Sequence, residues 1–399
     1  MTPEERAALR FDSKTVYYPE DGATQSIAAP LVMSSSFQYD AETYQRVVEG
    51  ERKDVNIYGR CGNPTEYQFE EQMMQIESAD ACLATASGMA AISVVLFGLL
   101  KSGDHIVCDW TTYSSTHEML DHRLTDFGIT TTFVDTADIE SVKAAIQENT
   151  RLIYFESIAN PTMKVADMNA LVEVARQHEV LTVCDNTFAS PCVIRPLEWG
   201  VDLVVESATK FISGHSDVIG GAICMKSEKL PADFLEQIRW DTMVKWGSPL
   251  APFNAWLLLR SMQTLSIRVE RQCQSAMKLA NHFAQHEKVN RVWYPGLASH
   301  AQHALAKMQM PTFGGMLSFD VGNANKALKV LDSLKLACFA ASLGGVRTTT
   351  QIPASMAFLD IPEAERRQMG ISDGMIRVSV GIEDIDDLIH DFDRALALV

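Results

Sequence analysis

The chain has 399 residues, of which 47% are hydrophobic and 21% charged, and its formal net charge is −17. This composition is typical of a globular protein and excludes a disordered one. The acidic balance argues against nucleic acid and anionic membranes as partners, because phosphate binding depends on clustered lysine and arginine.

The sequence offers no sign of a membrane segment or a metal site. The N-terminus lacks the apolar core of a signal peptide, and no apolar run approaches ~18 residues, so we expect a cytoplasmic protein without membrane contact. The eight cysteines include no CxxC pair and sit mostly in apolar runs. His300 and His303 lack the companion ligands that a metal would need, and we predict no metal.

Taken in chain order, the first 60 residues are irregular and rich in Ser, Thr and Tyr, which indicates an arm that contacts a neighbouring subunit. An alternation of helices and strands follows, and it is typical of a parallel sheet covered by helices. The predicted helices are 65–77, 89–100, 114–124, 139–147 and 168–178, and the predicted strands are 105–110, 130–135, 152–156, 181–186 and 202–207.

A long helical stretch over 251–286 leads to a C-terminal α+β unit with strands at 316–321 and 375–380 and a closing amphipathic helix at 386–399. Because single cores stop growing near ~250–300 residues, we expect two domains. We predict an α/β fold with a large, mostly parallel sheet and a smaller α+β domain. The predicted divisions are an arm over 1–60, a large domain over 61–255 and a C-terminal domain over 256–399.

Four chemically active side chains lie at or beyond the predicted carboxyl ends of strands, where open α/β sheets bind ligands. Lys210 follows the apolar run that ends near 205, and Asp185, Asn160 and Tyr113 follow other strands. Singly, each has a plain structural explanation, such as a solvated lysine or a turn-forming Asp or Asn. Together, an amine, an acid, an amide and a phenol suit pyridoxal 5'-phosphate (PLP), whose aldehyde needs a lysine and whose ring nitrogen needs an acid.

A phosphate site is also indicated. Ser87, Gly88 and Met89 begin a predicted helix, where backbone N–H groups and the positive end of the dipole favour an anion. Ser207 and Thr209 alternate on the approach to Lys210 and would point the same way. Neither a G-x-G-x-x-G motif nor a P-loop is present, which disfavours a dinucleotide site.

Eight stretches in family order make the chain resemble the Cys/Met-metabolism PLP-dependent enzymes, which include methionine γ-lyase, cystathionine γ-lyase, cystathionine γ-synthase and the O-acylhomoserine sulfhydrylases. The stretches are IYGRCGNPT (57–65), ATASGMAAI (84–92), ESIANPT (156–162), VCDNTFASP (183–191), SATKFISGHSDVIGG (207–221), SPLAPFNAWLLLR (248–260), SLGGV (342–346) and IRVSVGIED (376–384). Each is weak alone, and together they are specific.

The resemblance implies the fold type I architecture of PLP-dependent transferases and a homotetramer built from dimers that share active sites. It implies that Tyr58 and Arg60 grip the cofactor phosphate of the neighbouring subunit, a task that suits a permanent bidentate cation. The remaining implied cofactor residues are Lys210 as the Schiff-base lysine, Asp185 at the pyridine nitrogen, Tyr113 stacked on the ring, Asn160 near the ring hydroxyl, and Ser87, Gly88, Met89, Ser207 and Thr209 at the phosphate.

Arg377 stands in an otherwise apolar strand, where an unpaired charge is costly, so it needs an anion. A structural salt bridge would satisfy that need. The resemblance instead makes Arg377, helped by Ser342, the clamp for the α-carboxylate of an amino-acid substrate.

The implied reaction is PLP-dependent γ-elimination, with Lys210 moving the Cα proton and Tyr113 serving the leaving group. It would release 2-oxobutanoate, ammonia and the γ-substituent. A γ-replacement enzyme, such as a cystathionine γ-synthase or an O-succinylhomoserine sulfhydrylase, is the first alternative. A PLP-binding homologue without catalysis is the second.

The chain departs from the family pattern where the distal end of a substrate would lie. Ser115 stands where methionine γ-lyases carry Cys, Arg347 replaces an acidic residue, and Ala357 and Phe358 replace a hydroxyl and an imidazole. Glu206 stands where His is frequent. We therefore expect Ser115 and Arg347 to contact the substrate, which could be methionine, an O-acylhomoserine or canavanine. A cation at Arg347 would favour a succinyl group and oppose the cationic tail of canavanine.

Overall fold

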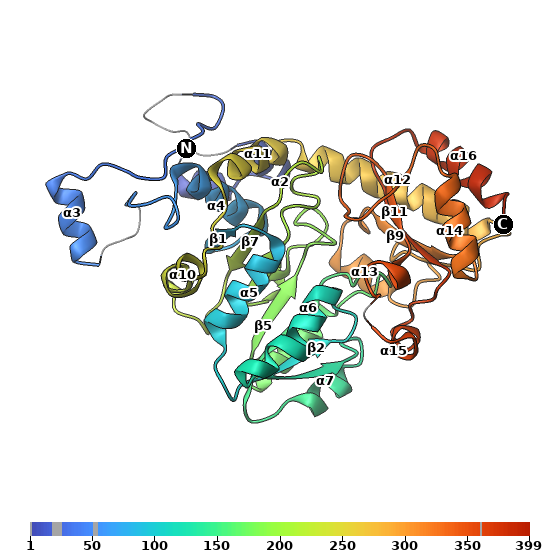
Figure 1. The fold of residues 1–399 in the computed structure, drawn as a ribbon, viewed down its shortest axis with the longest axis horizontal. Coiled ribbons are helices and arrows are strands. Elements are labelled where there is room, and N and C mark those ends of the chain that lie inside the picture. The colour runs from blue at the N-terminus through green and yellow to red at the C-terminus, as the bar shows by residue number, and fades with distance from the viewer. Residues whose placement is uncertain (1, 18–25, 51–54, 360) are drawn as a thin grey trace.

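The computed structural model describes residues 2–17, 26–50, 55–359 and 361–399. Parts of the predicted arm, at residues 1, 18–25 and 51–54, lie outside the described residues. The described part of the arm contains three short helices, of which the third lies away from the body of the molecule (Figure 1). These helices are α1 Pro3–Ala7, α2 Phe11–Val16 and α3 Ala41–Val48.

A seven-stranded sheet forms the centre of the large domain, with strand order β1-β7-β6-β5-β4-β2-β3. The five strands predicted from the sequence are present and pair in parallel, whereas β7 runs antiparallel to both β6 and β1. The strands are β1 Ala81–Thr85, β2 His105–Asp109, β3 Thr130–Val134, β4 Thr150–Glu156, β5 Leu181–Asp185, β6 Leu203–Glu206 and β7 Gly221–Met225. The prediction missed β1 and β7, which adjoin turns that contain Ser and Gly at Ser87–Gly88 and Gly220.

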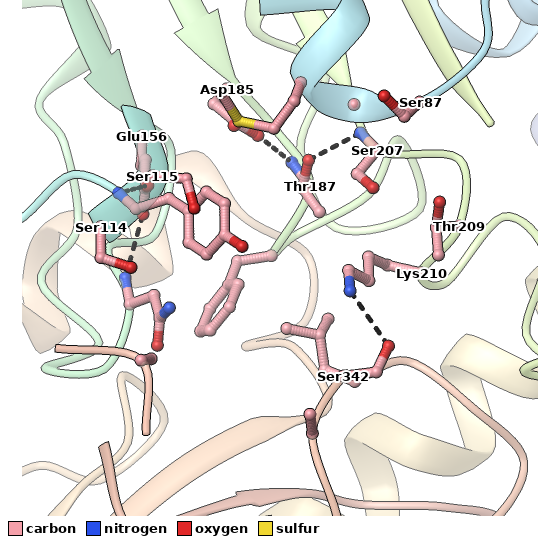
Figure 2. A pocket seen from close by; sticks show the side chains of 18 of the residues that line it. Ser87, Ser114, Ser115, Glu156, Asp185, Thr187, Ser207, Thr209, Lys210 and Ser342 are labelled. Carbon is pink, nitrogen blue, oxygen red and sulfur yellow. Dashed lines mark hydrogen bonds between the residues drawn. The ribbon is translucent and has the colours of Figure 1, made fainter. Parts of the chain in front are cut away.

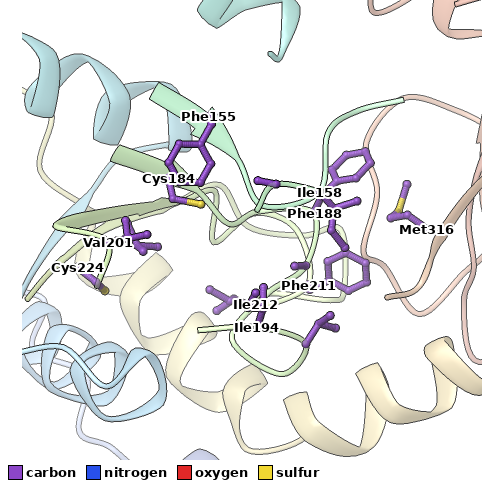
Figure 3. Packing of buried hydrophobic residues seen from close by; sticks show 14 of the residues in the cluster. Phe155, Ile158, Cys184, Phe188, Ile194, Val201, Phe211, Ile212, Cys224 and Met316 are labelled. Carbon is purple, nitrogen blue, oxygen red and sulfur yellow. The ribbon is translucent and has the colours of Figure 1, made fainter. Parts of the chain in front are cut away.

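Both faces of this sheet are apolar, because successive side chains of a strand point to opposite faces. In β4, Ile153 and Phe155 pack in one core with α4, while Leu152 and Tyr154 pack in a second core with α5. Figure 3 shows part of the first core. The helices of the large domain are α4 Pro64–Glu77, α5 Gly88–Leu99, α6 Ser114–Glu118, α7 Ile139–Ala145, α8 Met168–Gln177, α9 Phe234–Ile238 and α10 Val244–Trp246.

The stretch predicted as one helix over 251–286 forms two helices, α11 Pro252–Met262 and α12 Leu265–Gln285. The break is stabilised by the buried guanidinium of Arg268, which donates to the carbonyl oxygen of Ser261 at 3.0 Å and to that of Phe211 at 2.8 Å. Helix α12 then runs into the C-terminal domain (Figure 1). These hydrogen bonds therefore connect α12 to the segment that carries Lys210.

The C-terminal domain is built on a five-stranded sheet of order β10-β11-β12-β9-β8, with the two predicted strands at its centre. Its strands are β8 Arg291–Trp293, β9 Met316–Asp320, β10 Cys338–Phe339, β11 Thr349–Gln351 and β12 Met375–Ser379, and its further helices are α13 His303–Gln309, α14 Ala324–Ser333, α15 Glu363–Gln368 and α16 Ile385–Leu396. The predicted domain boundary at 255/256 falls within α11 and stays a prediction. No helix in the described part of the chain is long and apolar enough to cross a membrane.

A third hydrophobic core lies in the C-terminal domain and includes Phe283, whose ring centroid lies 4.4 Å from that of Phe319 and 5.2 Å from that of Phe392. We expect Phe283→Ala to lower the free energy of unfolding by about 3–5 kcal/mol, because a fully buried ring leaves a cavity. Denaturant unfolding followed by circular dichroism measures this. The control is Phe339→Ala, since Phe339 is 45% exposed. Equal losses in the two variants would contradict the assignment of Phe283 to the core.

Candidate active site

A cavity of about 730 Å³ opens at the carboxyl ends of β4, β5 and β6, facing a loop of the C-terminal domain. Figure 2 shows Lys210 and Ser342 approaching one another across it. The cavity brings together most of the side chains that the sequence singled out. Those that line it are Ser87, Gly88, Met89, Tyr113, Ser115, Asn160, Asp185, Ser207, Thr209, Lys210, Ser342 and Arg377.

Lys210 lies in a turn after β6, and its ammonium nitrogen donates to the hydroxyl oxygen of Ser342 at 3.0 Å. Burial and, to a smaller extent, the positive charge of Arg377 lower the pKa of Lys210 to about 8, while Asp185 opposes the shift. About a tenth of this amine is therefore uncharged at pH 7, far more than for an ordinary lysine. An uncharged amine is the form that attacks an aldehyde or accepts a proton.

Asp185 ends β5, and its carboxylate accepts hydrogen bonds from the backbone N–H of Thr187 at 3.0 Å and from the hydroxyl of Tyr154 at 3.4 Å. Burial raises the pKa of Asp185, and these hydrogen bonds counteract part of the rise. A buried carboxylate at a cavity wall favours a cationic or protonated partner. Asp185 can therefore hold a protonated ring nitrogen.

The start of α5 lines the cavity and suits an anion. The first N–H groups of this twelve-residue helix have no helical acceptors, and the hydroxyl oxygen of Ser87, the N-cap, accepts from one of them, the backbone N–H of Ala90, at 3.1 Å. Gly88 lets the helix approach the segment that follows β6 closely, since a Cβ added there would lie 2.6 Å from Cβ of Ser207. Helix N–H groups and hydroxyls so arranged suit a phosphate.

Glu156, the last residue of β4, is a site residue that the sequence reasoning missed. Its carboxylate accepts from the backbone N–H of Tyr113 at 2.6 Å and from that of Asn160 at 3.0 Å (Figure 2). Burial and the charge of Asp185 raise the pKa of Glu156. Glu156 therefore holds the two cavity loops that contain Tyr113 and Asn160 in fixed positions. Its position at the end of a predicted strand, like that of Asp185 with which it pairs in the sheet, was the sequence feature that could have identified it.

Arg377 lies on β12, is 4% exposed and forms no ion pair with any carboxylate among the described residues. Its guanidinium donates to the side-chain oxygen of Asn160 at 3.1 Å and to the carbonyl oxygen of Ser342 at 2.9 Å, and its Nε has no partner. Burial lowers the pKa of Arg377 to about 9. A desolvated cation with an unused donor beside a cavity is a site for a carboxylate.

Three predicted site residues do not line the cavity of their own chain. The guanidinium of Arg60 donates to the carbonyl oxygen of Val244 at 2.7 Å and lies 5.6 Å from the ring centroid of Tyr58. Arg347 is exposed and outside the lining, so within one chain it has no contact through which to select a substrate. Ser115, in contrast, lies at the cavity wall.

Comparison with known proteins identifies the relatives of this chain. A sequence profile described as "Cys/Met metabolism PLP-dependent enzyme" matches residues 14–397. The chain is 42% identical over 374 residues to an L-methionine gamma-lyase of Fusobacterium nucleatum subsp. polymorphum, with 93% of each covered. It is 39% identical over 400 residues to a cystathionine beta-lyase of Coxiella burnetii, with 99% of this chain and 100% of that protein covered.

Two solved structures are similar over nearly the whole chain. The cystathionine gamma-lyase from Lactobacillus plantarum complexed with L-serine has a TM-score of 0.90 and 36% identity, covering 98% of this chain and 99% of that one. A putative O-acetylhomoserine (thiol)-lyase from Campylobacter jejuni, with N'-pyridoxyl-lysine-5'-monophosphate, has a TM-score of 0.93 and 30% identity, covering 98% of this chain and 100% of that one.

The lowered pKa of Lys210 is testable in the cofactor-free protein. We expect the rate of modification by an amine-directed reagent to rise with pH to a midpoint near 8, because only the uncharged amine reacts. Mass spectrometry of the modified peptide gives the rate, with exposed Lys101 as an internal reference. A midpoint at the usual lysine value of 10.5 would show that Lys210 is not desolvated.

Proposed function

Because this chain belongs to the Cys/Met metabolism PLP-dependent enzyme family, and is a PLP-dependent lyase, we propose that it catalyses γ-elimination on an L-amino acid with a neutral γ-substituent. A thioether of the methionine type is the substrate class that fits best. The balanced reaction with methionine consumes water and gives methanethiol, 2-oxobutanoate and ammonia. The observation that carries the proposal is the buried guanidinium of Arg377, which has no carboxylate partner among the described residues, in a cavity lined by apolar and neutral polar side chains.

The residues of the cavity fit PLP. Lys210 offers a desolvated amine for the aldehyde, Asp185 a buried carboxylate for the ring nitrogen, and the start of α5 with Ser207 a site for the phosphate. Tyr113 is 40% exposed at the cavity wall and is suited to stack on the ring. PLP, when bound, supplies an electron sink that stabilises negative charge on the carbons of an amino-acid substrate.

We assign the substrate's α-carboxylate to Arg377. The guanidinium is held by the side chain of Asn160 and the carbonyl oxygen of Ser342, and Nε remains available. A carboxylate here would satisfy the donor and neutralise the charge that burial destabilises. It would also fix the Cα atom of the substrate toward Lys210, since both residues contact Ser342.

Lys210 is the group that we assign to proton transfer at Cα. Its pKa near 8 places both protonation states within reach at neutral pH, which is what a general acid–base group needs. The hydroxyl of Ser342 accepts from its nitrogen and holds it on the side of the cavity that faces the substrate. Glu156 fixes the backbone of Tyr113, so the phenol stays near the leaving group.

The composition of the cavity lining supports a neutral leaving group. Beside the neutral polar side chains of Ser114, Ser115 and Gln351, the lining has apolar residues, and its carboxylates among the described residues, Glu156 and Asp185, are both engaged in hydrogen bonds. A cationic tail such as that of canavanine would therefore meet no free carboxylate among the described residues of the chain. The apolar lining residues that carry this argument are Ile158, Ala341, Leu343, Met356 and Ala357.

We further propose that Tyr58 and Arg60 serve the cofactor phosphate of a second subunit, in a homotetramer built from dimers. Support comes from their position, because neither lines the cavity of its own chain. Tyr58 is 44% exposed and Arg60 carries a cation suited to phosphate.

A substrate panel tests the reaction. We expect methionine to release 2-oxobutanoate without an added thiol, O-succinylhomoserine to react more slowly, and canavanine to be the poorest substrate because its tail is charged. Assays separating 2-oxobutanoate from pyruvate distinguish γ- from β-elimination, and Lys210→Ala is the inactive control. Turnover that requires a thiol would establish the γ-replacement alternative, and predominant pyruvate would establish a β-lyase.

Arg377 and Arg347 give a matched pair of variants for the carboxylate assignment. We expect Arg377→Lys to raise KM for methionine about 10- to 100-fold, because it loses charge-assisted hydrogen bonds of ~1.5–3 kcal/mol. Arg347→Ala should leave KM within about twofold, because that side chain is outside the cavity. Steady-state kinetics measures both. A large rise in KM for Arg347→Ala alone would reverse the assignment.

A further inference from the structure

Two buried carboxyl groups meet on the face of the large sheet that is turned away from Asp185. Glu77 is the last residue of α4 and is 0% exposed, and Glu206 is the last residue of β6 and is 2% exposed. Side chains alternate along β6, so Glu206 lies on the same face as Val204, in the core that includes α4. The two carboxyl groups are hydrogen-bonding partners.

No cation compensates this pair among the described residues. Neither Glu77 nor Glu206 forms an ion pair, and Arg195, the one cation that acts on Glu77, is itself paired with Glu198 at 2.8 Å. Glu77 also stands at the C-terminal end of α4, where the helix dipole opposes a negative charge. Two full charges at this place would therefore be strongly destabilising.

Hydrogen-bond donors are also too few for two carboxylates. The side-chain amide of Asn186 donates to Glu77 at 3.4 Å and to the carbonyl oxygen of Ile194 at 3.0 Å. Oε2 of Glu77 and Oε1 of Glu206 are buried without a donor. A proton held between the two groups would supply the missing donor, as in other carboxyl pairs that share a site.

We propose that Glu77 and Glu206 share one proton, so that this pair, on the sheet face opposite Asp185, carries one negative charge instead of two. Glu206 is the donor and Glu77 the acceptor. The remaining titratable groups that interact with the pair are Asp185 on β5, the thiols Cys82 on β1, Cys184 on β5, Cys192 in the segment after β5 and Cys224 on β7, and the Arg195–Glu198 pair.

The pair acts on the active site through Asp185, whose charge raises the pKa of Glu206 and is affected in return. With the proton on Glu206, Asp185 meets less negative charge and stays ionised, which is the state that holds a protonated ring nitrogen. Glu206 is in this sense a positioning residue. This consequence rests on the proposed role of Asp185, whereas the shared proton does not.

The pH dependence of stability follows from burial. Burial raises the pKa of Glu77 to about 7. Burial raises the pKa of Glu206 well above its usual value, and the negative charge of Glu77 adds to that rise. Between the pKa of an unfolded glutamic acid and the folded pKa of Glu206, the folded chain keeps a proton on Glu206 that the unfolded chain has released. The contribution of Glu206 to stability is therefore fully present below its unfolded pKa and is lost as pH rises toward its folded pKa.

Glu206→Gln removes this loss of stability with rising pH, because the amide is a neutral mimic of the protonated acid. Between the unfolded and the folded pKa of Glu206, the unfolding equilibrium constant of the unchanged holoenzyme should rise about tenfold per pH unit relative to that of the variant. Melting temperatures across this range report the same widening gap. Glu148→Gln, at an exposed position, should follow the unchanged enzyme at every pH.

Infrared spectroscopy of the holoenzyme at pH 8 detects the proton directly, through the C=O stretch of a protonated carboxyl. The difference spectrum should show that Glu206→Gln loses this band and that Glu148→Gln retains it. Should Glu206→Gln fold poorly, Glu77→Gln replaces it and should also widen the stability gap with pH. An unchanged carboxyl band together with parallel stability curves would overturn the shared proton, whatever the enzyme turns out to catalyse.

Discussion

Two cationic side chains, Lys210 and Arg377, lie in one desolvated cavity, and the rest of the site depends on this arrangement. Desolvation lowers the pKa of both, and each is held by hydrogen bonds to Ser342 instead of by a carboxylate. A cavity of this kind binds an anion at Arg377 and keeps a reactive amine at Lys210. The charges of a bound substrate and cofactor would offset the energetic cost of burying these two cations.

The two cations come from different domains, which explains why the fold needs both sheets. Lys210 follows β6 of the parallel sheet, and Arg377 lies on β12 of the C-terminal sheet. Arg268 of α12 connects the two domains, because it donates to backbone carbonyls of the segment after Lys210. A shift between the domains would therefore change the separation of amine and guanidinium, and with it the placement of Cα.

The carboxyl groups in and near the cavity have different roles. Glu156 accepts two backbone N–H groups and is structural, and Asp185 faces the cavity and is available to a ring nitrogen. Glu77 and Glu206 lie on the opposite face of the sheet, and their shared proton would limit the negative charge near Asp185. Environment, more than residue type, assigns these roles, because burial and neighbouring charge decide which carboxyl keeps a proton.

The sequence by itself determined the alternating large domain, the lysine and acid at strand ends, and the family, because these depend on local periodicity and on motifs that lie together in the chain. Tertiary structure alone decided the bond from Lys210 to Ser342, the role of Glu156, and the exclusion of Arg347 from the cavity. It also decided that Glu77 meets Glu206, which are 129 positions apart in the sequence. Local patterns carry no information on which distant segments pack together, and desolvation, which sets the charge of every one of these groups, exists only after they have packed.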